Sequence, residues 1–254
     1  MKLLDMFSLK GRSGYVTGAA RGIGRSIAEG LAEAGARVAV VDIDYEGAKN
    51  TSLRLKEQGC QAFAVQADVT DKHQVQHMVD KIIQRWGRLD IGVNNAGRVI
   101  NEPAERMSEA QWDAVIDLNL KGVFLTAQAA GKVMIRQKSG SIINIASMSA
   151  RVVNHPQPQV AYNASKAGVI MVTKSLALEW VSYGVRVNSI SPGYISTALL
   201  GTMEDLHKKW IDNTPMKRLG EPDELKGLAV YLASDASSFM TGSDLVIDGG
   251  FTLW

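Results

Sequence analysis

Two side chains that can move a proton together stand four residues apart, at Tyr162 and Lys166. Residues at this spacing on a helix project from one face on successive turns, so we expect the two side chains to lie side by side. A free phenol has a pKa of about 10, and a neighbouring ammonium lowers that pKa because it favours the phenolate. The same spacing is also common on solvated helix faces. If the pair is functional, its chemistry is proton transfer to or from an oxygen atom.

A glycine-rich run, TGAARGIG from Thr17 to Gly24, has the spacing of a pyrophosphate-binding turn. In such a turn Gly18 permits the tight bend, Gly22 lets backbone amides approach the pyrophosphate, and Gly24 lets a helix lie close to a sheet. The helix start adds unpaired N–H groups and a partial positive charge. The alternative is a tight strand-to-helix turn without a ligand. The run therefore favours, without proving, a dinucleotide site.

The acidic residue Asp42 ends the run VAVVD, eighteen positions after Gly24. A carboxylate at this place accepts hydrogen bonds from a ribose diol and repels a 2′-phosphate, which favours NAD over NADP. Arg21 points the other way, because a guanidinium in the glycine run can neutralise a 2′-phosphate. A plain turn role for Asp42 also fits its position. We predict NAD as the cofactor, with NADP the less favoured choice.

The elements that must position these residues follow from alternating patterns, because short β-branched runs alternate with longer helical stretches. Expected strands are 14–17, 37–42, 62–67, 89–93, 141–146, 185–191 and 244–247, and expected helices are 23–34, 46–58, 75–86, 109–136, 161–183 and 223–232. No Pro/Gly/Ser-rich linker or break in composition interrupts the pattern. We expect one α/β domain over residues 1–254, a Rossmann fold whose doubly wound, seven-stranded parallel sheet has helices on both faces.

The stretch 194–214 is longer than an ordinary connection and contains Met203, Leu206 and Trp210. Long loops within compact α/β domains tend to be lids or binding segments, although some are surface excursions. We therefore predict that residues 194–214 form a substrate-binding loop or lid within the single domain.

The amino-acid composition argues against some classes of binding partner. Hydrophobic residues make up 46% and charged residues 21% of the 254 residues, as in soluble globular proteins. The formal net charge is +2, and the basic residues are scattered, which argues against a nucleic-acid partner. No apolar run approaches the ~18 residues of a membrane span. The lone Cys60 cannot form an intrachain disulfide, which favours a reducing, cytoplasmic compartment.

A metal site is not expected. His73 and His77 stand four apart on an expected helix, which is a spacing that can bind zinc. No third ligand accompanies them and the intervening residues include no glutamate, so a solvated helix face is the favoured interpretation.

Six motifs occur in a fixed order along the chain: TGAARGIG, NNAG at 94–97, LNLKGVF around Asn119, INIASMS around Ser147, YNASK at 162–166 and PGYIST at 192–197. This set resembles the short-chain dehydrogenase/reductase family over essentially the whole chain. The resemblance implies an enzyme that transfers hydride between a nicotinamide dinucleotide and a small-molecule alcohol or ketone. It also implies a homotetramer.

The resemblance further implies roles for individual residues. Tyr162 would be the acid/base, Lys166 would hold the nicotinamide ribose and lower the pKa of Tyr162, and Ser147 would hydrogen-bond the substrate oxygen. Asn119 would anchor a water that links Lys166 to solvent. Positions that match dinucleotide contacts are Gly18, Arg21, Gly22, Ile23, Gly24, Asp42, Asp68, Val69, Asn95, Tyr162, Lys166, Pro192, Gly193, Ile195 and Thr197. Asn94, Ala96 and Gly97 look mainly structural.

One spacing departs from the family pattern. Ser147 precedes Tyr162 by fifteen positions, two more than is common in the family, and the common spacing would select Ser149. We select Ser147 because it ends the strand-like INIAS run and keeps the usual separation from Asn119. Ser149 then becomes a candidate substrate contact.

Further segments of the sequence indicate the class of substrate. ASMS followed by VVN, TPM at 214–216 and the ending DGGFTLW are similar to polyol dehydrogenases of galactitol, arabinitol and mannitol type. We expect oxidation of a secondary alcohol in a sugar alcohol to a ketose, with Ser147, Ser149, Asn154, Gln157 and Tyr162 contacting the substrate. Ser149, Asn154 and Gln157 are equally well interpreted as plain loop residues. Alternative functions are a gluconate 5-dehydrogenase-like, 3-oxoacyl or general ketone reductase, and a catalytically silent dinucleotide-binding protein.

Overall fold

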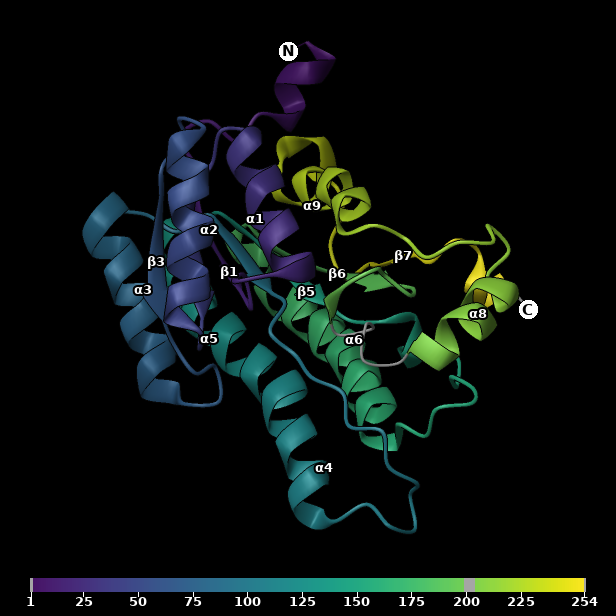
Figure 1. Ribbon diagram of the computed structural model, residues 1–254. Coiled ribbons are helices and arrows are strands. Elements are labelled where there is room, and N and C mark those ends of the chain that lie inside the picture. The colour runs from purple at the N-terminus through teal and green to yellow at the C-terminus, as the bar shows by residue number, and fades with distance from the viewer. Residues whose placement is uncertain (1, 199–203, 254) are drawn as a thin grey trace.

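A single seven-stranded parallel sheet runs through the computed structural model, which describes residues 2–198 and 204–253 (Figure 1). The strands are β1 (Ser13–Thr17), β2 (Arg37–Asp42), β3 (Ala62–Gln66), β4 (Ile91–Asn94), β5 (Gly140–Ile145), β6 (Val185–Pro192) and β7 (Asp244–Ile247). Their spatial order is β3-β2-β1-β4-β5-β6-β7, and every neighbouring pair is parallel. The expected doubly wound sheet is confirmed.

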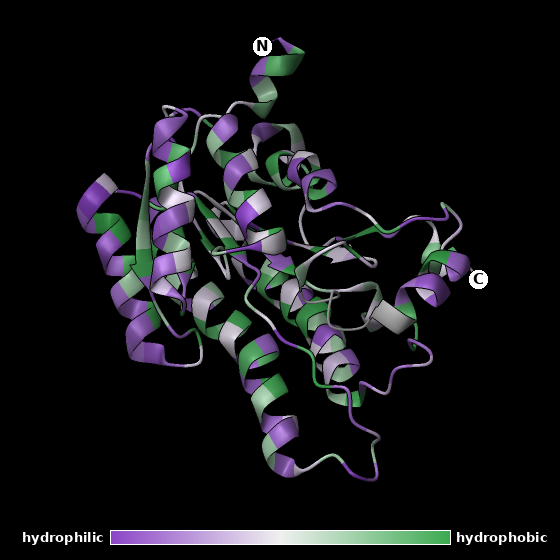
Figure 2. Cartoon of the chain, in the orientation of Figure 1, coloured by the Kyte–Doolittle hydropathy of each residue, from purple (hydrophilic) through white to green (hydrophobic). Residues whose placement is uncertain are grey.

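Helices cover both faces of the sheet (Figure 1). One layer consists of α1 (Gly22–Glu33), α2 (Tyr45–Glu57) and α9 (Lys226–Ala233), and the other of α3 (Lys72–Trp86), α5 (Gly122–Gln137) and α6 (Val160–Trp180). Because side chains alternate along a strand, Val38 and Val40 of β2 pack under the first layer while Ala39 and Val41 pack under the second. Green and purple turns alternate along α2 and α3 in Figure 2, as expected for helices with one buried face.

The expected helix over 109–136 is three elements. α4 (Glu109–Ile116) passes through a π-helical turn (Asp117–Lys121) into α5, and together they form the long rod at the bottom of Figure 1. Single π-helical turns inside α-helices are frequent at functional sites. Asn119 lies within this turn.

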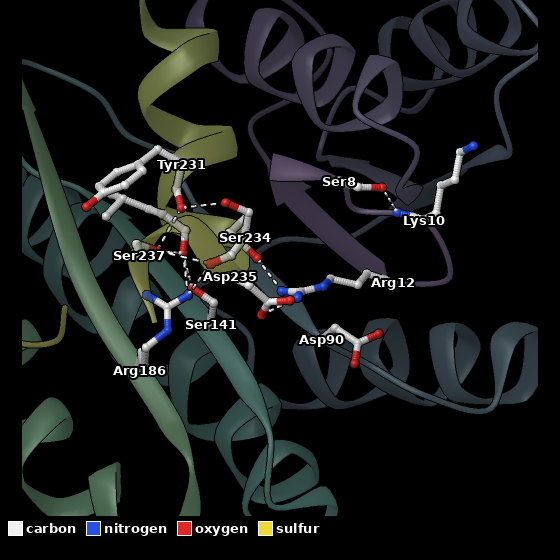
Figure 3. Close-up of polar contacts among 12 residues, drawn as sticks. Ser8, Lys10, Arg12, Asp90, Ser141, Arg186, Tyr231, Ser234, Asp235 and Ser237 are labelled. Carbon is white, nitrogen blue, oxygen red and sulfur yellow. Dashed lines mark hydrogen bonds and ion pairs between the residues drawn. The ribbon is translucent and has the colours of Figure 1, made fainter. Parts of the chain in front are cut away.

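Partly buried hydrogen bonds hold the carboxyl end of α9 against the sheet (Figure 3). The Arg186 guanidinium donates to the carbonyl oxygens of Leu232 at 2.7 Å and Ser234 at 3.2 Å. Arg12 donates to the Ala233 carbonyl at 2.7 Å. The last carbonyls of a helix have no partner within the helix, so these cations satisfy them and also meet the negative end of its dipole. The contacts fasten α9 to the start of β1 and to β6.

The stretch predicted as a loop or lid contains a helix. α8 (Glu204–Asn213) lies within it, and Ile195 forms a bridge with Gly220 across its base. Figure 1 shows α8 apart from the two helical layers, beside the end of the chain. Trp210 of α8 is 1% exposed, so the segment is packed against the body of the protein through a large apolar side chain. Met203, together with residues 199–202, lies outside the described residues.

Within the described ranges, none of the helices combines the length and the hydropathy that a membrane crossing requires.

Candidate active site

One cleft of about 870 Å³ opens at the carboxyl ends of the strands. Its wall includes Gly18 after β1 and Asn95 after β4, where the strand order reverses, and open α/β sheets bind ligands at this kind of point. Every residue predicted to contact the dinucleotide or the substrate lies on this wall. Asn119 lies behind the wall, fully buried. The fold therefore gathers into one place residues that are spread over 180 positions of sequence, from Gly18 to Thr197.

The glycine run takes a conformation that side chains would obstruct. Gly18 and Gly22 have φ of +64° and +59°, in the left-handed region that glycine adopts without strain. At Gly24 a Cβ atom would overlap the carbonyl oxygen of Gly18. The Asn95 side-chain amide donates to the Thr17 carbonyl at 2.9 Å and to the Gly18 carbonyl at 3.1 Å, which ties the turn to the end of β4. The N-terminus of α1 is thus held open to the cleft.

Asp42 both supports the turn after β2 and lines the cleft. Its carboxylate oxygens accept hydrogen bonds from the backbone N–H of Ala20 at 2.9 Å and of Asp44 at 3.0 Å. The side chain also lines the cleft. Each carboxylate oxygen can accept more than one hydrogen bond, so the turn contacts leave capacity for a ligand. Arg21 lies on the same wall with an exposed side chain.

The opposite wall comes from the segment after β6. Gly193 approaches the chain after β7 closely, since a Cβ there would come 2.7 Å from the Cα of Asp248. Thr197 faces the glycine turn, because a Cβ on Gly22 would lie 3.5 Å from the Thr197 methyl carbon. Asp68, on the side of β3, accepts from the backbone N–H and the hydroxyl of Thr70 at 2.9 and 2.7 Å. These contacts fix both rims of the cleft.

Tyr162 and Lys166 lie next to each other at the start of α6. The Lys166 Nζ atom is 5.6 Å from the centre of the Tyr162 ring, and it donates to the Ile145 carbonyl oxygen at 2.7 Å. Lys166 is 4% exposed, and burial lowers its pKa to about 8. The expected neighbourhood is present, with the ammonium bonded to the end of β5.

The pKa of Tyr162 moves in the direction opposite to the one expected from a neighbouring ammonium. Burial raises the pKa of this phenol, and a hydrogen bond with Ser147 only partly opposes the rise. Burial has this effect because a low-dielectric surrounding penalises the phenolate. Tyr162 is therefore a neutral, proton-bearing phenol at neutral pH in this structure.

The two candidate serines, Ser147 and Ser149, lie side by side on the cleft wall. Of the two, Ser147 is the serine whose side chain lowers the pKa of Tyr162. It also accepts from the Ser149 backbone N–H at 3.1 Å, and the two hydroxyls are 3.0 Å apart. The Ser147 hydroxyl is therefore held in place by Ser149, on the wall that also contains Tyr162.

Asn119 connects the π-helical turn to the loop after β4. Its Oδ1 accepts from the Arg98 backbone N–H at 2.9 Å, and its Nδ2 donates to the Arg98 carbonyl at 2.9 Å and to the Ser165 hydroxyl at 3.1 Å. A Cβ on Gly97 would lie 3.2 Å from Asn119 Oδ1 and 3.6 Å from Lys166 Nζ. Asn119 and Lys166 therefore both border the space beside Gly97.

The predicted substrate residues meet an aromatic pair that the motif pattern did not assign. Asn154 and Gln157, each about 95% buried, donate through their side-chain amides to the Tyr194 hydroxyl at 2.9 and 2.8 Å. The Tyr194 ring stacks on Trp210, with ring centres 4.4 Å apart and planes 14° from parallel. Trp210 was singled out only as a member of the long segment. The signal for Tyr194 was its position directly after Pro192 and Gly193.

The two histidines considered as metal ligands lie on α3, and neither of them lines the cleft. The described part of the chain contains no group of three or more His, Cys, Asp or Glu side chains arranged to hold a metal ion.

Comparison with known proteins identifies relatives along the full chain. A family model described as Enoyl-(Acyl carrier protein) reductase matches residues 18–252. Sorbose reductase SOU1 of Candida albicans is 42% identical over 98% of this chain and 90% of its own length. The NADP-dependent mannitol dehydrogenase of Hypocrea jecorina is 43% identical over 99% and 96%. Galactitol 2-dehydrogenase of Rhizobium johnstonii is 40% identical over the whole of both chains.

Solved structures share the same architecture. A short-chain type dehydrogenase/reductase from Mycobacterium marinum is 44% identical, with a TM-score of 0.97 over 99% of both chains. A gluconate 5-dehydrogenase from Burkholderia cenocepacia, solved in complex with NADP and tartrate, is 38% identical, with a TM-score of 0.95 over 100% of both chains.

Proposed function

The chain belongs to the short-chain dehydrogenase/reductase family, and we propose that within it this enzyme uses NAD to oxidise a secondary alcohol of a sugar alcohol to a ketose. Membership makes it an oxidoreductase that acts on alcohol groups with a nicotinamide dinucleotide. One observation carries the substrate class. Next to Tyr162 the cleft wall is built from hydroxyl and amide side chains, those of Ser147, Ser149, Asn154, Gln157 and Tyr194. A wall of this kind presents hydroxyl and amide groups that can hydrogen-bond a substrate with several hydroxyl groups.

The named relatives support the same class. Relatives at 40–44% identity are described as sorbose reductase, mannitol dehydrogenase, galactitol dehydrogenase and D-threitol dehydrogenase. All four names describe chemistry on sugar alcohols or ketoses.

The residues of the chain divide the work as follows. Ser147 and Tyr162 hydrogen-bond the substrate oxygen from two sides, and Tyr162 exchanges the proton of that oxygen. When bound, the nicotinamide ring supplies the hydride acceptor for oxidation and a positive charge that favours the phenolate of Tyr162. Lys166, anchored on the Ile145 carbonyl, presents its remaining N–H groups to the cofactor ribose. In the reverse direction the neutral phenol is already in the state needed to donate a proton to a ketone oxygen.

NAD is the proposed cofactor because Asp42 presents a fixed carboxylate where the ribose would lie. Arg21 on the same wall and the NADP named in relatives favour the other cofactor. Initial rates with NAD and NADP at equal concentrations decide between them. A rate with NADP above that with NAD would overturn the cofactor proposal.

A second candidate is a gluconate-type dehydrogenase. Arg98 lines the cleft with an exposed side chain, and a guanidinium there can pair with the carboxylate of a sugar acid. Gluconate 5-dehydrogenase appears among the similar structures.

The deciding experiment is a panel of initial rates over sugar alcohols, ketoses, gluconate, a 3-oxoacyl thioester and simple ketones, each with both cofactors. The proposal expects the highest kcat/KM on a sugar alcohol or its ketose. Preferred turnover of gluconate or of an acyl thioester would replace it. Tyr162→Phe tests whether this site performs the reaction: its rate should fall by about 10²- to 10⁴-fold, the usual worth of a general acid/base. Unchanged activity in Tyr162→Phe would favour a catalytically silent site.

We also propose a homotetramer in which the outer face of α6 is an interface. Met171, Leu178 and Val181 are 60%, 80% and 50% exposed on or next to that helix. Val169 and Leu176 of the same helix are buried within the chain and serve its own core. Light scattering that gives the mass of a monomer at working concentration would overturn the tetramer.

We also propose that the segment 194–214 forms part of the substrate pocket, because Tyr194 and Trp210 lie on the cleft wall. A cytoplasmic location remains a prediction from the lone Cys60.

A further inference from the structure

The hydroxyl of Tyr194 is unusual because both of its acceptor positions are taken by buried amides. Asn154 Nδ2 donates to it at 2.9 Å and Gln157 Nε2 at 2.8 Å. A phenol oxygen has two lone pairs and one hydrogen. Only the hydrogen of this hydroxyl is therefore available for a further hydrogen bond.

The orientation of the Gln157 amide is fixed by chemistry. Its Oε1 accepts from the Trp210 indole N–H at 3.2 Å. An indole nitrogen can only donate, so Gln157 must turn its oxygen to Trp210 and its NH₂ group to Tyr194. Asn154 is oriented in the same sense, because its Oδ1 accepts from Gln159 Nε2 at 3.0 Å and its Nδ2 is left for Tyr194.

The Tyr194 ring itself is held in place. It stacks on Trp210, and the ring of Phe251 meets it edge-on with centres 5.3 Å apart. Tyr194 lines the cleft together with Tyr162. The two phenols are also near enough that ionisation of Tyr194 raises the pKa of Tyr162. The cleft therefore contains a phenol of fixed position, beside the proposed acid/base, whose neighbours force it to be a donor.

From these contacts we infer that Tyr194 donates a hydrogen bond to a second oxygen of the substrate, distinct from the oxygen held by Ser147 and Tyr162. Tyr194 is then a specificity-determining residue that selects substrates with an additional hydroxyl or carbonyl near the reacting carbon. The inference rests on the proposed function and names the residue through which the enzyme distinguishes a polyol from a simple alcohol. Trp210 and Gln157 are positioning residues, because they act through the hydroxyl of Tyr194.

The test compares two substrates in one variant. Tyr194→Phe keeps the ring that stacks on Trp210 and removes only the hydroxyl. We expect kcat/KM to fall on the order of 10-fold for the sugar alcohol that the wild type oxidises best, as for loss of one hydrogen bond to the substrate. For 2-butanol, which has no second oxygen, kcat/KM should stay within about 2-fold. The KM for the dinucleotide should not change.

The variant also leaves the Asn154 and Gln157 amides without their acceptor, so a purely structural effect must be separated. Structural damage would lower kcat/KM by the same factor for both substrates, and that outcome overturns the inference. Tyr183→Phe is the matched control: Tyr183 is 48% exposed, in the short turn after α6, and its variant should behave as the wild type.

Trp210→Phe gives a second, independent arm and decides the matter if Tyr194→Phe does not fold. It keeps an aromatic ring against Tyr194 and removes the indole N–H that orients Gln157. The Gln157 amide can then turn its oxygen toward Tyr194 and accept the hydrogen otherwise given to the substrate. We expect a loss of preference for the sugar alcohol over 2-butanol with Tyr194 intact. An unchanged preference in Tyr194→Phe overturns the inference, and so does an unchanged preference in Trp210→Phe if Tyr194→Phe does not fold.

The rates of the wild type and of Tyr194→Phe distinguish failure of the proposed function from failure of the inference about Tyr194. A wild type that oxidises 2-butanol at least as well as every sugar alcohol refutes the proposed function, and the inference with it. If the wild type prefers sugar alcohols and the Tyr194→Phe variant keeps this preference, the inference alone is refuted.

Discussion

Replacing Gly24 by alanine would test how closely α1 must approach the glycine turn for the dinucleotide site to exist. The added Cβ would lie 2.5 Å from the Asn95 side-chain nitrogen and 2.8 Å from the Gly18 carbonyl carbon, and it would overlap the carbonyl oxygen. Alanine gains about 1 kcal/mol over glycine in a helix. Overpacking costs about 1–3 kcal/mol, and here part of the contact is with backbone, which cannot rotate away. We therefore expect a net loss of roughly 1–2 kcal/mol in the free energy of unfolding.

The same displacement should weaken cofactor binding, because Gly18 and the Asn95 amide that holds it must both shift. A shift of this kind removes backbone N–H groups from the pyrophosphate position, and about 10-fold weaker binding corresponds to only about 1.4 kcal/mol. Denaturant unfolding followed by tryptophan fluorescence gives the stability. Titration with NADH, followed by its own fluorescence, gives the dissociation constant.

Gly227→Ala is the matched control, since Gly227 also lies in a helix, α9. Apart from its chain neighbours and the nearby backbone of its own helix, no atom of the described residues lies within 4 Å of the position that its Cβ would take. Here helix propensity acts alone, so the variant should gain about 1 kcal/mol and bind NADH as the wild type does. Our reasoning about close approach would be refuted if Gly24→Ala bound the cofactor normally, or if the two variants changed stability by the same amount.

Three further outcomes follow from individual contacts. Arg186→Met should lower the free energy of unfolding by about 2–4 kcal/mol, because the buried carbonyls of Leu232 and Ser234 lose a charged donor. The control Arg54→Met, on the exposed side of α2, should change the free energy of unfolding little. Equal losses of stability in the two variants would contradict this prediction. Burial lowers the pKa of Lys166 to about 8, so between about pH 8 and 10.5 the unfolded state binds more protons than the folded state, and stability rises with pH. Measured against Lys166→Met, which lacks the ammonium, wild-type stability should therefore gain roughly 1.5 kcal/mol from pH 8 to about 9.5, and a flat difference would refute this. Asp42→Asn removes the charge that repels a 2′-phosphate, so the ratio of kcat/KM with NADP to that with NAD should rise on the order of 10-fold, and an unchanged ratio would show that this carboxylate does not select the cofactor.

The order of the elements could be predicted from the sequence, because each depends on signals within its own segment. The strands at 37–42 and 244–247 have the predicted bounds, since β-branched runs end there at turn residues. The helix expected to reach residue 183 ends at Trp180 and continues as a 3-10 turn, since boundaries depend on weak terminal contacts. The residues of the cleft wall were also predicted from motifs, because in a parallel sheet all carboxyl ends of strands meet at one edge.

Tertiary structure alone decided properties that depend on what surrounds a side chain. The direction of the pKa shift of Tyr162 is set by burial, which no local spacing reveals. The same holds for the exposure of Leu178 beside the burial of Leu176. Gln157, Tyr194 and Trp210 come from three separate segments, and they hydrogen-bond and stack only because the fold places those segments together. Local sequence encodes the elements, whereas the charge state and hydrogen bonding of the cleft residues arise from contacts between distant parts of the chain.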